Sequence, residues 1–405
     1  MDEIWIPRDM LSVLQQETGI FVHIILGPRQ CGKSTLLQYI GQGVYDEVTL
    51  DDLLMRRLAE TGPAFFLTQY TLPVIIDEIQ YAPNLFPAIK QYVDQLKQKR
   101  LHQKGQPAPR VLFYLTGSNQ ILFDKHVKET LVGRARYFYL KTLSVHEICA
   151  ARPTCSVQTI LFQGGWPELY HDSPVRVVPY LNDYIQQYIE KEIILSVGIT
   201  KQREFAIVLG MLAARTEQLL NMQSIAKDSG VSVNTVKEWI AVLERTRLLS
   251  LLQPFESKLS KRLTKSPKLY FLDTGLAVRL QGWTEATPMI QSALAGGLFE
   301  TLVFAEIIKY IHNFQKDWRV FLWRTKDQEE IDFLVQIGRE RWLAIDAKLG
   351  MGSVQAASVP AALSTLFPSI KTLIVVTLGG EKRYLSETCL QVPITALVSV
   401  FESLE

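Results

Sequence analysis

The chain has 405 residues, 47% of them hydrophobic and 21% charged, and its 43 basic and 41 acidic side chains leave a formal net charge of +2. This composition excludes a disordered or fibrous protein, and the length allows two to four domains that each have a core. Because the net charge is close to zero, any attraction to nucleic acid must rest on local clusters of cations.

The cysteines and the apolar segments indicate the cellular compartment. Cys31, Cys149, Cys155 and Cys389 show neither C-x-x-C pairing nor zinc spacing, which favours a reducing environment. The first ten residues begin acidic and lack the apolar stretch of a signal peptide. No apolar run reaches transmembrane length. We therefore expect a soluble, cytoplasmic protein with no membrane partner.

A glycine-rich loop follows the first apolar run. Residues 20–26 predict a buried strand, residues 34–40 predict the start of a helix, and between them lies a complete G-x-x-x-x-G-K-[ST] pattern. Its expected nucleotide-binding residues are Gly27, Pro28, Arg29, Gln30, Cys31, Gly32, Lys33, Ser34 and Thr35. In such a loop, backbone amides and a helix N-terminus surround the phosphates of a nucleotide. Lys33 is expected to neutralise the β- and γ-phosphates, and the Ser34 hydroxyl to hold Mg²⁺.

A second apolar run, residues 72–76, ends in the carboxylates Asp77 and Glu78. A buried parallel strand would deliver Asp77 to the Mg²⁺ shell beside the phosphate loop. Glu78 is one residue further on, where it can polarise the attacking water as a general base. The order of loop and acidic strand predicts an ATP hydrolase.

Two further polar positions are candidates for the catalytic site. The apolar run 110–115 is followed by Thr116-Gly117-Ser118-Asn119, and Asn119 either senses the γ-phosphate or belongs to a plain turn. Arg134 precedes another apolar run, residues 137–140. It either meets transition-state charge, in its own or a neighbouring subunit, or lies on the surface.

These elements, together with Gly164-Gly165-Trp166-Pro167-Glu168, resemble the prokaryotic AAA-superfamily ATPases that carry a C-terminal domain of unknown function. The resemblance runs nearly the length of the chain. Asn119 stands where a second serine is usual in that family, and Trp166 where tyrosine is usual. The resemblance implies ATP and Mg²⁺ as cofactors, and subunits of such ATPases often complete each other's sites, which makes a homo-oligomer one expectation.

The middle of the chain predicts helices. Residues from Pro174 to about Glu204 have helical apolar spacing, and the stripe of Tyr180, Tyr184 and Tyr188 predicts packing between domains. Residues 205–282 predict a winged helix: helices at 206–220, 224–229 and 234–245, then two short strands at 248–252 and 268–272. The loop 257–268 between the strands carries five cations and no acid, which favours contact with nucleic-acid phosphates.

The last part of the chain has the element order of PD-(D/E)XK nucleases. An amphipathic helix at 298–308 carries Glu300 and Glu306, either of which can supply the helix carboxylate. A strand follows with Asp332, and another with Asp346-Ala347-Lys348. Carboxylates on neighbouring strands can share a metal ion, and Lys348 can stabilise developing charge without being a ligand. The expected metal ligands are Glu300, Asp332 and Asp346. The competing interpretation is paired surface charges on a half-buried sheet.

The predicted fold class is α/β: a P-loop parallel sheet with helices on both faces, a helical connector, a winged helix and a smaller restriction-endonuclease-like domain. The expected boundaries are 1–145, 146–204, 205–282 and 283–405. Two functions remain open. One is an ATPase that couples hydrolysis to the binding or remodelling of nucleic acid, DNA included. The other is an ATP-dependent regulatory or scaffold switch whose later domains bind protein and cut nothing.

Overall fold

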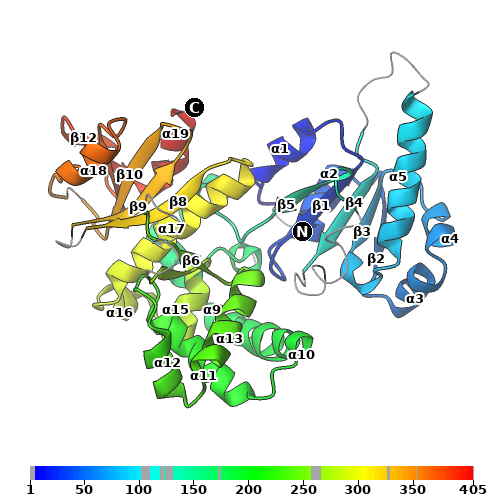
Figure 1. The fold of residues 1–405 in the computed structure, drawn as a ribbon, viewed down its shortest axis with the longest axis horizontal. Coiled ribbons are helices and arrows are strands. Elements are labelled where there is room, and N and C mark those ends of the chain that lie inside the picture. The colour runs from blue at the N-terminus through cyan, green and yellow to red at the C-terminus, as the bar shows by residue number, and fades with distance from the viewer. Residues whose placement is uncertain are drawn as a thin grey trace. The chain divides into compact units, whose positions relative to one another are not determined.

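The computed structural model describes residues 5–101, 110–118, 123, 131–171, 175–256, 266–325, 329–352 and 354–404. The chain divides into two compact units (Figure 1). The first comprises residues 7–141 with 312–315, and the second comprises residues 142–311 with 316–405. Among the described residues, no helix combines the length and the apolar character that crossing a bilayer requires.

The first unit alternates strands and helices. Its elements are α1 (Met10–Gln16), β1 (Val22–Leu26), α2 (Lys33–Gly41), β2 (Asp46–Thr49), α3 (Leu53–Thr61), α4 (Pro63–Thr68), β3 (Val74–Asp77), η1 (Ile79–Tyr81), α5 (Leu85–Leu101), β4 (Phe113–Gly117) and β5 (Ala135–Tyr139). The strands form one parallel sheet in the order β2-β3-β4-β1-β5. All five residues of β1 and of β4 are buried, as expected for central parallel strands. The predicted P-loop sheet is therefore confirmed.

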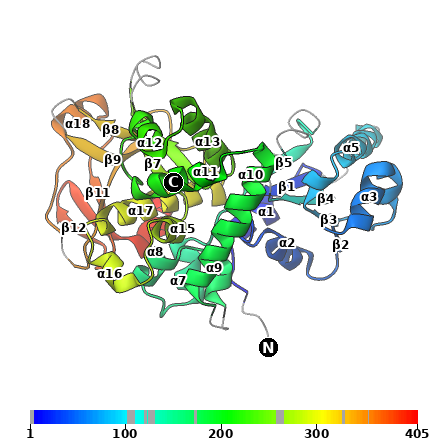
Figure 2. The same cartoon turned by 90° about the horizontal axis from the view of Figure 1, so that it is seen from below.

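The order of the strands places helices on both faces. The crossover from β1 to β2 runs in one direction along the sheet, and the crossover from β3 to β4 runs in the other. Because such crossovers are right-handed, α2 and α5 must cover opposite faces. Figure 2 shows the two helices on the two sides of the sheet. The carboxyl ends of β1, β3 and β4, which the phosphate loop and the acidic pair follow, meet at one edge.

The second unit begins with a helical region. Its elements are α7 (Val145–Ala151), α8 (Val157–Gln163), η2 (Pro167–Tyr170), α9 (Val177–Tyr184), the π-helical η3 (Ile185–Ile193), α10 (Ile194–Val197), α11 (Gln202–Ala214), α12 (Met222–Ser229), α13 (Val233–Arg245), β6 (Leu249–Leu252), β7 (Lys268–Phe271), α15 (Thr274–Leu280) and α16 (Ala286–Ile290). Strands β6 and β7 form an antiparallel pair.

Asp273 ties the start of this unit to α15. Its side chain accepts hydrogen bonds from the Thr142 hydroxyl (2.9 Å), the Gly165 amide (2.9 Å) and the Leu276 amide (3.2 Å). Gly164 has φ +76°, and a Cβ there would lie 2.1 Å from Asp273 Oδ1. Gly164 is thus explained by close packing onto this buried carboxylate, and Gly165 by the backbone of Leu143, whose carbonyl oxygen would lie 2.2 Å from a Cβ there.

The connector differs from the continuous helical segment expected over 174–204. Helical structure runs from Val177 to Val197 and ends where Gly198 adopts φ +74° and donates its amide to Ile194 O. A new helix, α11, begins at Gln202. Tyr184 and Tyr188 are buried with ring centroids 5.2 Å apart, and the expected packing between domains stays a prediction.

The predicted helix-turn-helix elements are present, with one correction. The first helix was expected to reach Leu220, but α11 ends at Ala214. The chain turns there because Glu217, with φ +69°, donates its amide to Leu269 O in β7, and Leu219 forms a bridge with Lys268. A strand contact thus replaces the last turn of the helix.

The carboxyl-terminal part is a six-stranded mixed sheet with helices. Its elements are α17 (Ala295–Asn313), β8 (Arg319–Arg324), β9 (Glu330–Gln336), β10 (Trp342–Lys348), α18 (Ala361–Leu366), β11 (Leu373–Thr377), β12 (Arg383–Ser386), β13 (Cys389–Pro393), η4 (Ile394–Ala396) and α19 (Leu397–Glu402). The strand order is β12-β13-β11-β10-β9-β8. Strands β8, β9 and β10 are antiparallel neighbours, whereas β11 runs parallel to β10. The expected helix and the two strands that carry Asp332 and Asp346 are all present.

Candidate functional site

The glycine-rich loop joins the end of β1 to the start of α2. Gly27 passes so close to the backbone of Leu140 that a Cβ would lie 2.2 Å from its carbonyl oxygen, so only glycine fits. Pro28 and Cys31 are buried, whereas Arg29, Gln30 and Thr35 are exposed. Arg8, itself buried, donates from its two terminal nitrogens to Cys31 O and Lys141 O, both at 2.7 Å. This guanidinium links the phosphate loop to the segment that follows β5.

Lys33 and Ser34 open the helix that follows the loop. The Lys33 side chain is 5% exposed, and its ammonium donates to Gly27 O at 3.1 Å and to Pro28 O at 3.0 Å. The cation therefore lies over the loop, at the position from which it could meet phosphate oxygens. The Ser34 hydroxyl donates to Asp77, with both carboxylate oxygens 3.1 Å away. The loop and the acidic end of β3 meet in a hydroxyl–carboxylate pair.

The carboxylates of Asp77 and Glu78 are held by the neighbouring strand β4. The Thr116 hydroxyl donates to Asp77 and accepts the Glu78 amide at 3.2 Å. Glu78 Oε2 accepts from the Ser118 amide at 3.1 Å, from the Ser118 hydroxyl at 2.8 Å and from the Gln80 amide group. Because β4 is the sheet neighbour of β3, residues at the carboxyl end of β4 can form hydrogen bonds with both acids.

Glu78 adopts a left-handed backbone conformation, with φ 55° and ψ 44°. For a residue other than glycine this conformation costs about 1–2 kcal/mol. Retained strain of this kind clusters at functional sites, where the surrounding contacts enforce it. Here the contacts to Ser118 and Gln80 fix the carboxylate at the edge that also carries the phosphate loop.

The two acids differ in proton affinity. Burial raises the pKa of Asp77 above its usual value, and the nearby charge of Glu78 adds to this, while the hydrogen bond from Thr116 opposes it. Burial also acts to raise the pKa of Glu78, but the charge of Lys33 and the hydrogen bonds from Gln80 and Ser118 outweigh it and leave that pKa lowered. Glu78 is thus kept ionised, as a proton acceptor must be.

The remaining two predicted catalytic residues have different outcomes. Asn119 lies outside the described residues. Arg134 forms a bidentate ion pair with Asp94 of α5, at 2.6 and 2.9 Å, and donates a third hydrogen bond to Val132 O. The pair with Arg134 lowers the pKa of Asp94. Arg134 is thus paired within its own chain, and its catalytic role stays a prediction.

Sequence reasoning missed three residues at this site. Thr116, Ser118 and Gln80 contact the acidic pair, whereas only the neighbouring Asn119 was singled out. The signal was present in the Thr-Gly-Ser turn, because it ends the strand that the sheet order places beside β3. Arg8 was also missed. A lone arginine near the amino terminus carries no local pattern that marks it.

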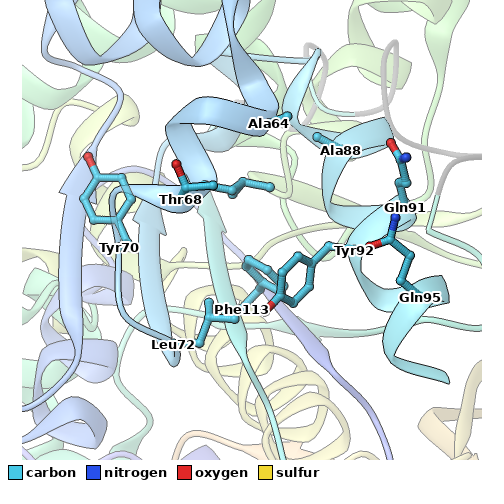
Figure 3. Close-up of a pocket in the computed structure, with 10 residues that line it drawn as sticks. Ala64, Thr68, Tyr70, Leu72, Ala88, Gln91, Tyr92, Gln95 and Phe113 are labelled. Carbon is cyan, nitrogen blue, oxygen red and sulfur yellow. The ribbon is translucent and has the colours of Figure 1, made fainter. Parts of the chain in front are cut away.

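A separate cavity of about 500 Å³ opens between α4 and α5 (Figure 3). Leu67, Thr68, Tyr92 and Gln95 line it from the two helices, and Phe113 lines it from the start of β4. Because the cavity lies by the amino-terminal ends of β3 and β4, it is at the opposite edge of the sheet from the phosphate loop. It is not part of the nucleotide site.

The acidic residues of the carboxyl-terminal part form a half-buried cluster. Asp332 of β9 and Asp346 of β10 are adjacent: the Asp332 amide donates to Asp346 Oδ1 at 3.2 Å, and the Ala347 amide donates to Asp332 Oδ2 at 2.9 Å. Burial, followed by the charge of Asp332, raises the pKa of both Asp346 and Glu300. Lys348 is exposed at the end of β10.

The helix carboxylate of this cluster is Glu300. Its Oε1 accepts a hydrogen bond from Lys268 Nζ at 3.0 Å and another from the Tyr270 hydroxyl at 2.5 Å. Glu306, the alternative, is buried elsewhere on α17, where it accepts the Val145 amide at 2.8 Å and pairs with Lys309 at 2.9 Å. Glu306 therefore serves the packing of α17 and α7.

Lys268 requires a correction. It was counted among the cations of a solvent-facing basic loop, but its side chain is only 8% exposed and pairs with Glu300 and, at 2.6 Å, with Glu330. Burial alone would lower the pKa of Lys268, yet the charges of Glu300, Glu330 and Asp332 raise it instead, so the ammonium is retained. The other four cations of the loop, at 258, 261, 262 and 265, lie outside the described residues.

The site geometry and a family match agree on the first unit. Strand β4 lies between the strand before the phosphate loop and the strand that ends in Asp77, and residues 21–149 match the model described as an AAA domain. Residues 21–149 form an AAA-type P-loop domain. Residues 155–287 and 295–397 match two domains of unknown function, DUF8612 and DUF4143. The expected resemblance is thereby confirmed.

Relatives of this protein are similar over most of its length. Uncharacterized proteins of Mycobacterium tuberculosis (Rv2008c) and Mycobacterium bovis (Mb2031c) are each 26% identical over 380 residues, which cover 92% of this chain and 80% of the relative. The solved ORC2 protein of Aeropyrum pernix is 12% identical in its ADPNP–ADP complexes, with a TM-score of 0.31 over 71% of this chain and 93% of that chain. The ADP form of that protein is 13% identical, with a TM-score of 0.26 over 75% of this chain and 96% of that chain.

Proposed function

We propose that this protein is a Mg²⁺-dependent ATP hydrolase, with its site at the edge where the loop, β3 and β4 meet. The observation that carries the proposal is the contact between the Ser34 hydroxyl and both oxygens of Asp77 at 3.1 Å, beside the strained, hydrogen-bonded Glu78. Mg²⁺ prefers oxygen ligands, and in P-loop proteins it is held by a serine or threonine hydroxyl and an aspartate carboxylate. Ser34 and Asp77 therefore fit the ion.

Each residue then has a separate task. The backbone amides from Gly27 to Ser34 and the N-terminus of α2 bind the phosphates, and Lys33 neutralises their charge. Ser34 and Asp77 hold Mg²⁺, which when bound withdraws charge from the β- and γ-phosphate oxygens. Glu78 orients the attacking water and accepts its proton, with Ser118 and Gln80 fixing the carboxylate. Thr116 couples the two acids through one hydroxyl.

Two substitutions test this assignment. Lys33→Ala should abolish tight nucleotide binding, measured by calorimetry with Mg²⁺. Glu78→Gln should keep nucleotide affinity within a few-fold but lower turnover by roughly 10²–10⁴-fold, the usual loss when a general base is removed. Glu47→Gln, an exposed glutamate on β2, is the matched control and should leave turnover unchanged. Unchanged turnover in Glu78→Gln would show that the base lies elsewhere.

We further propose that ATP turnover is coupled to binding of nucleic acid through a winged helix formed by α11, α12, α13 and the β6–β7 pair. Helix α13 presents Asn234, Lys237 and Arg245 on its exposed face. The β6–β7 pair bounds the segment that carries four more cations. Clustered cations attract phosphates, and their binding to nucleic acid releases counterions.

The alternative is a protein-binding switch, and one observation favours it. Glu238 is exposed on the same face of α13, where its charge would oppose a phosphate. Adding single- or double-stranded DNA or RNA to the ATPase assay separates the two functions. Stimulated turnover, together with weaker and less salt-dependent binding in Lys237→Ala, supports the nucleic-acid function. No change in turnover with any of these polymers supports the switch.

A further inference from the structure

The acidic cluster of the carboxyl-terminal part already contains a cation from its own chain. The Lys268 ammonium bridges Glu300 of α17 and Glu330 of β9, with Nζ–O distances of 3.0 and 2.6 Å. Asp332 is two residues beyond Glu330 on β9, so the two side chains point to the same face of the sheet. The charges of Lys268 and Asp332 also act on each other.

The backbone keeps Lys268 in this place. Lys268 is the first residue of β7, where it pairs with Leu252 of β6 and forms a bridge with Leu219. The hydroxyl of Tyr270, on the same face of β7, donates to the same Glu300 oxygen. Two side chains of one strand thus reach one carboxylate, and the lysine needs no rearrangement to stay there.

With Lys268 among them, the carboxylates are not arranged to share a metal ion. One oxygen of Asp332 accepts the Ala347 amide, one oxygen of Asp346 accepts the Asp332 amide, and Glu300 Oε1 is taken by Lys268 and Tyr270. Within the described part of the chain, no three acidic, histidine or cysteine side chains are grouped so that they could hold a metal. The arrangement therefore disagrees with the magnesium site that the nuclease-like element order predicts.

We infer that Lys268 is a built-in counter-ion that occupies the place of a divalent metal, so that the carboxyl-terminal part of this protein does not carry out metal-dependent cleavage. The lysine neutralises part of the charge that a metal ion would otherwise balance. It also joins β7 of the winged helix to α17 and β9. The inference does not depend on ATP hydrolysis, because it concerns a different site in the second unit.

Removing the lysine should convert the cluster into a metal site. A buried carboxylate left without its partner is strongly unfavourable, and a divalent cation is one way to restore the balance. The test measures Mn²⁺ binding to the full-length protein without nucleotide, by calorimetry. Lys268→Met, which keeps the length of the side chain without its charge, should bind one more Mn²⁺ per chain than the wild type. That affinity should fall at least tenfold when Asp332→Asn is added.

Controls separate this outcome from others. Lys371→Met, at an exposed lysine of the same part of the chain, should bind no additional Mn²⁺. Lys268→Arg should exclude the ion as the wild type does. If Lys268→Met does not fold, the comparison of the wild type with Asp332→Asn still tests the inference. The two proteins are expected to bind the same number of Mn²⁺ ions per chain. The inference is overturned if the wild type binds an ion that Asp332→Asn removes, or cleaves DNA in Mn²⁺ with an activity that Asp346→Ala abolishes.

Discussion

Arg8 shows how a residue distant from the nucleotide can shape its site. The guanidinium is buried and bridges Cys31 O in the phosphate loop and Lys141 O after β5, each at 2.7 Å. The donors of a planar guanidinium have fixed directions, so the group holds two carbonyls in one geometry more rigidly than a rotatable ammonium does. Arg8 is therefore a positioning residue for the loop.

We expect Arg8→Ala to weaken ATP binding by roughly tenfold, because unsatisfied buried carbonyls cost about 1–3 kcal/mol and 1.4 kcal/mol is tenfold in affinity. Calorimetric titration of the nucleotide measures the effect. Arg8→Lys should fall between wild type and Arg8→Ala. Equal affinity in all three proteins would show that the loop holds its shape without this contact.

His23 gives the first unit a dependence on pH. It lies in the middle of β1 between Tyr114 and Phe138, fully buried, and neither ring nitrogen has a hydrogen-bond partner among the described residues. Burial, helped by the charge of Arg136, lowers the pKa of His23 from 6.5 to about 4. The folded protein thus binds this proton less readily than the unfolded chain does.

The sign of the effect follows from linkage. Between pH 6.5 and about 4 the unfolded chain carries more protons, so the free energy of unfolding should fall as the pH falls through this window. The full effect is about 3 kcal/mol, from about 1.36 kcal/mol per unit of pKa. Denaturant unfolding at several pH values should show a weaker pH dependence in His23→Phe than in wild type. His146→Gln, at an exposed histidine, should keep the wild-type dependence.

At the scale of elements, α7 begins with a capping box. The Ser144 hydroxyl accepts the Glu147 amide at 3.1 Å, and the Glu147 carboxylate accepts the Ser144 amide at 2.8 Å. Both residues are buried, so their polar groups cannot be satisfied by water instead. The box fixes the chain where the second unit begins.

Ser144→Ala should lower the free energy of unfolding of the second unit by about 1–2 kcal/mol, the upper part of the range for lost caps. Chemical denaturation measures this change. Ser156→Ala removes an exposed cap of α8, where a single amide is held, and should cost less. A larger loss in Ser156→Ala than in Ser144→Ala would contradict the role given to burial.

Elements with a strong local signal could be predicted from the sequence. The phosphate loop, the strand before Asp77 and the helix-turn-helix all have patterns that are complete within a few residues. The premature end of α11 could not be foreseen, because Glu217 turns away to bond with Leu269, more than fifty residues later. The acidic cluster was predictable to the same extent. Its charged residues could be picked out from the sequence, but the burial of Lys268 depends on Glu300 and Glu330, which only the fold brings near it.

At the scale of the whole molecule, the two units have separate cores. Residues 7–141 contain the nucleotide site, and residues 142–311 with 316–405 contain Lys268 and the acidic cluster. A ligand stabilises the unit that binds it, by RT ln(1 + [L]/Kd), which is about 2.7 kcal/mol at a hundredfold excess over Kd. The units should therefore respond differently to nucleotide.

We expect ATP with Mg²⁺ to raise the unfolding midpoint of the first unit more than that of the second. Proteolysis during thermal denaturation, with fragments assigned by mass spectrometry, distinguishes the two. In Lys33→Ala the nucleotide should no longer raise either midpoint. Equal stabilisation of both units by nucleotide in the wild type would show that they unfold as one.

Cys31 lies inside the phosphate loop with no exposed surface, and its sulfur is 3.6 Å from Leu140 O. Alkylating reagents must reach a sulfur to modify it, so the half-buried Cys149 and Cys155 should react well before Cys31. Oxidants and maleimides would then spare the ATP site until the loop itself opens. The enclosed thiol should therefore stay unmodified for as long as the phosphate loop keeps its folded shape.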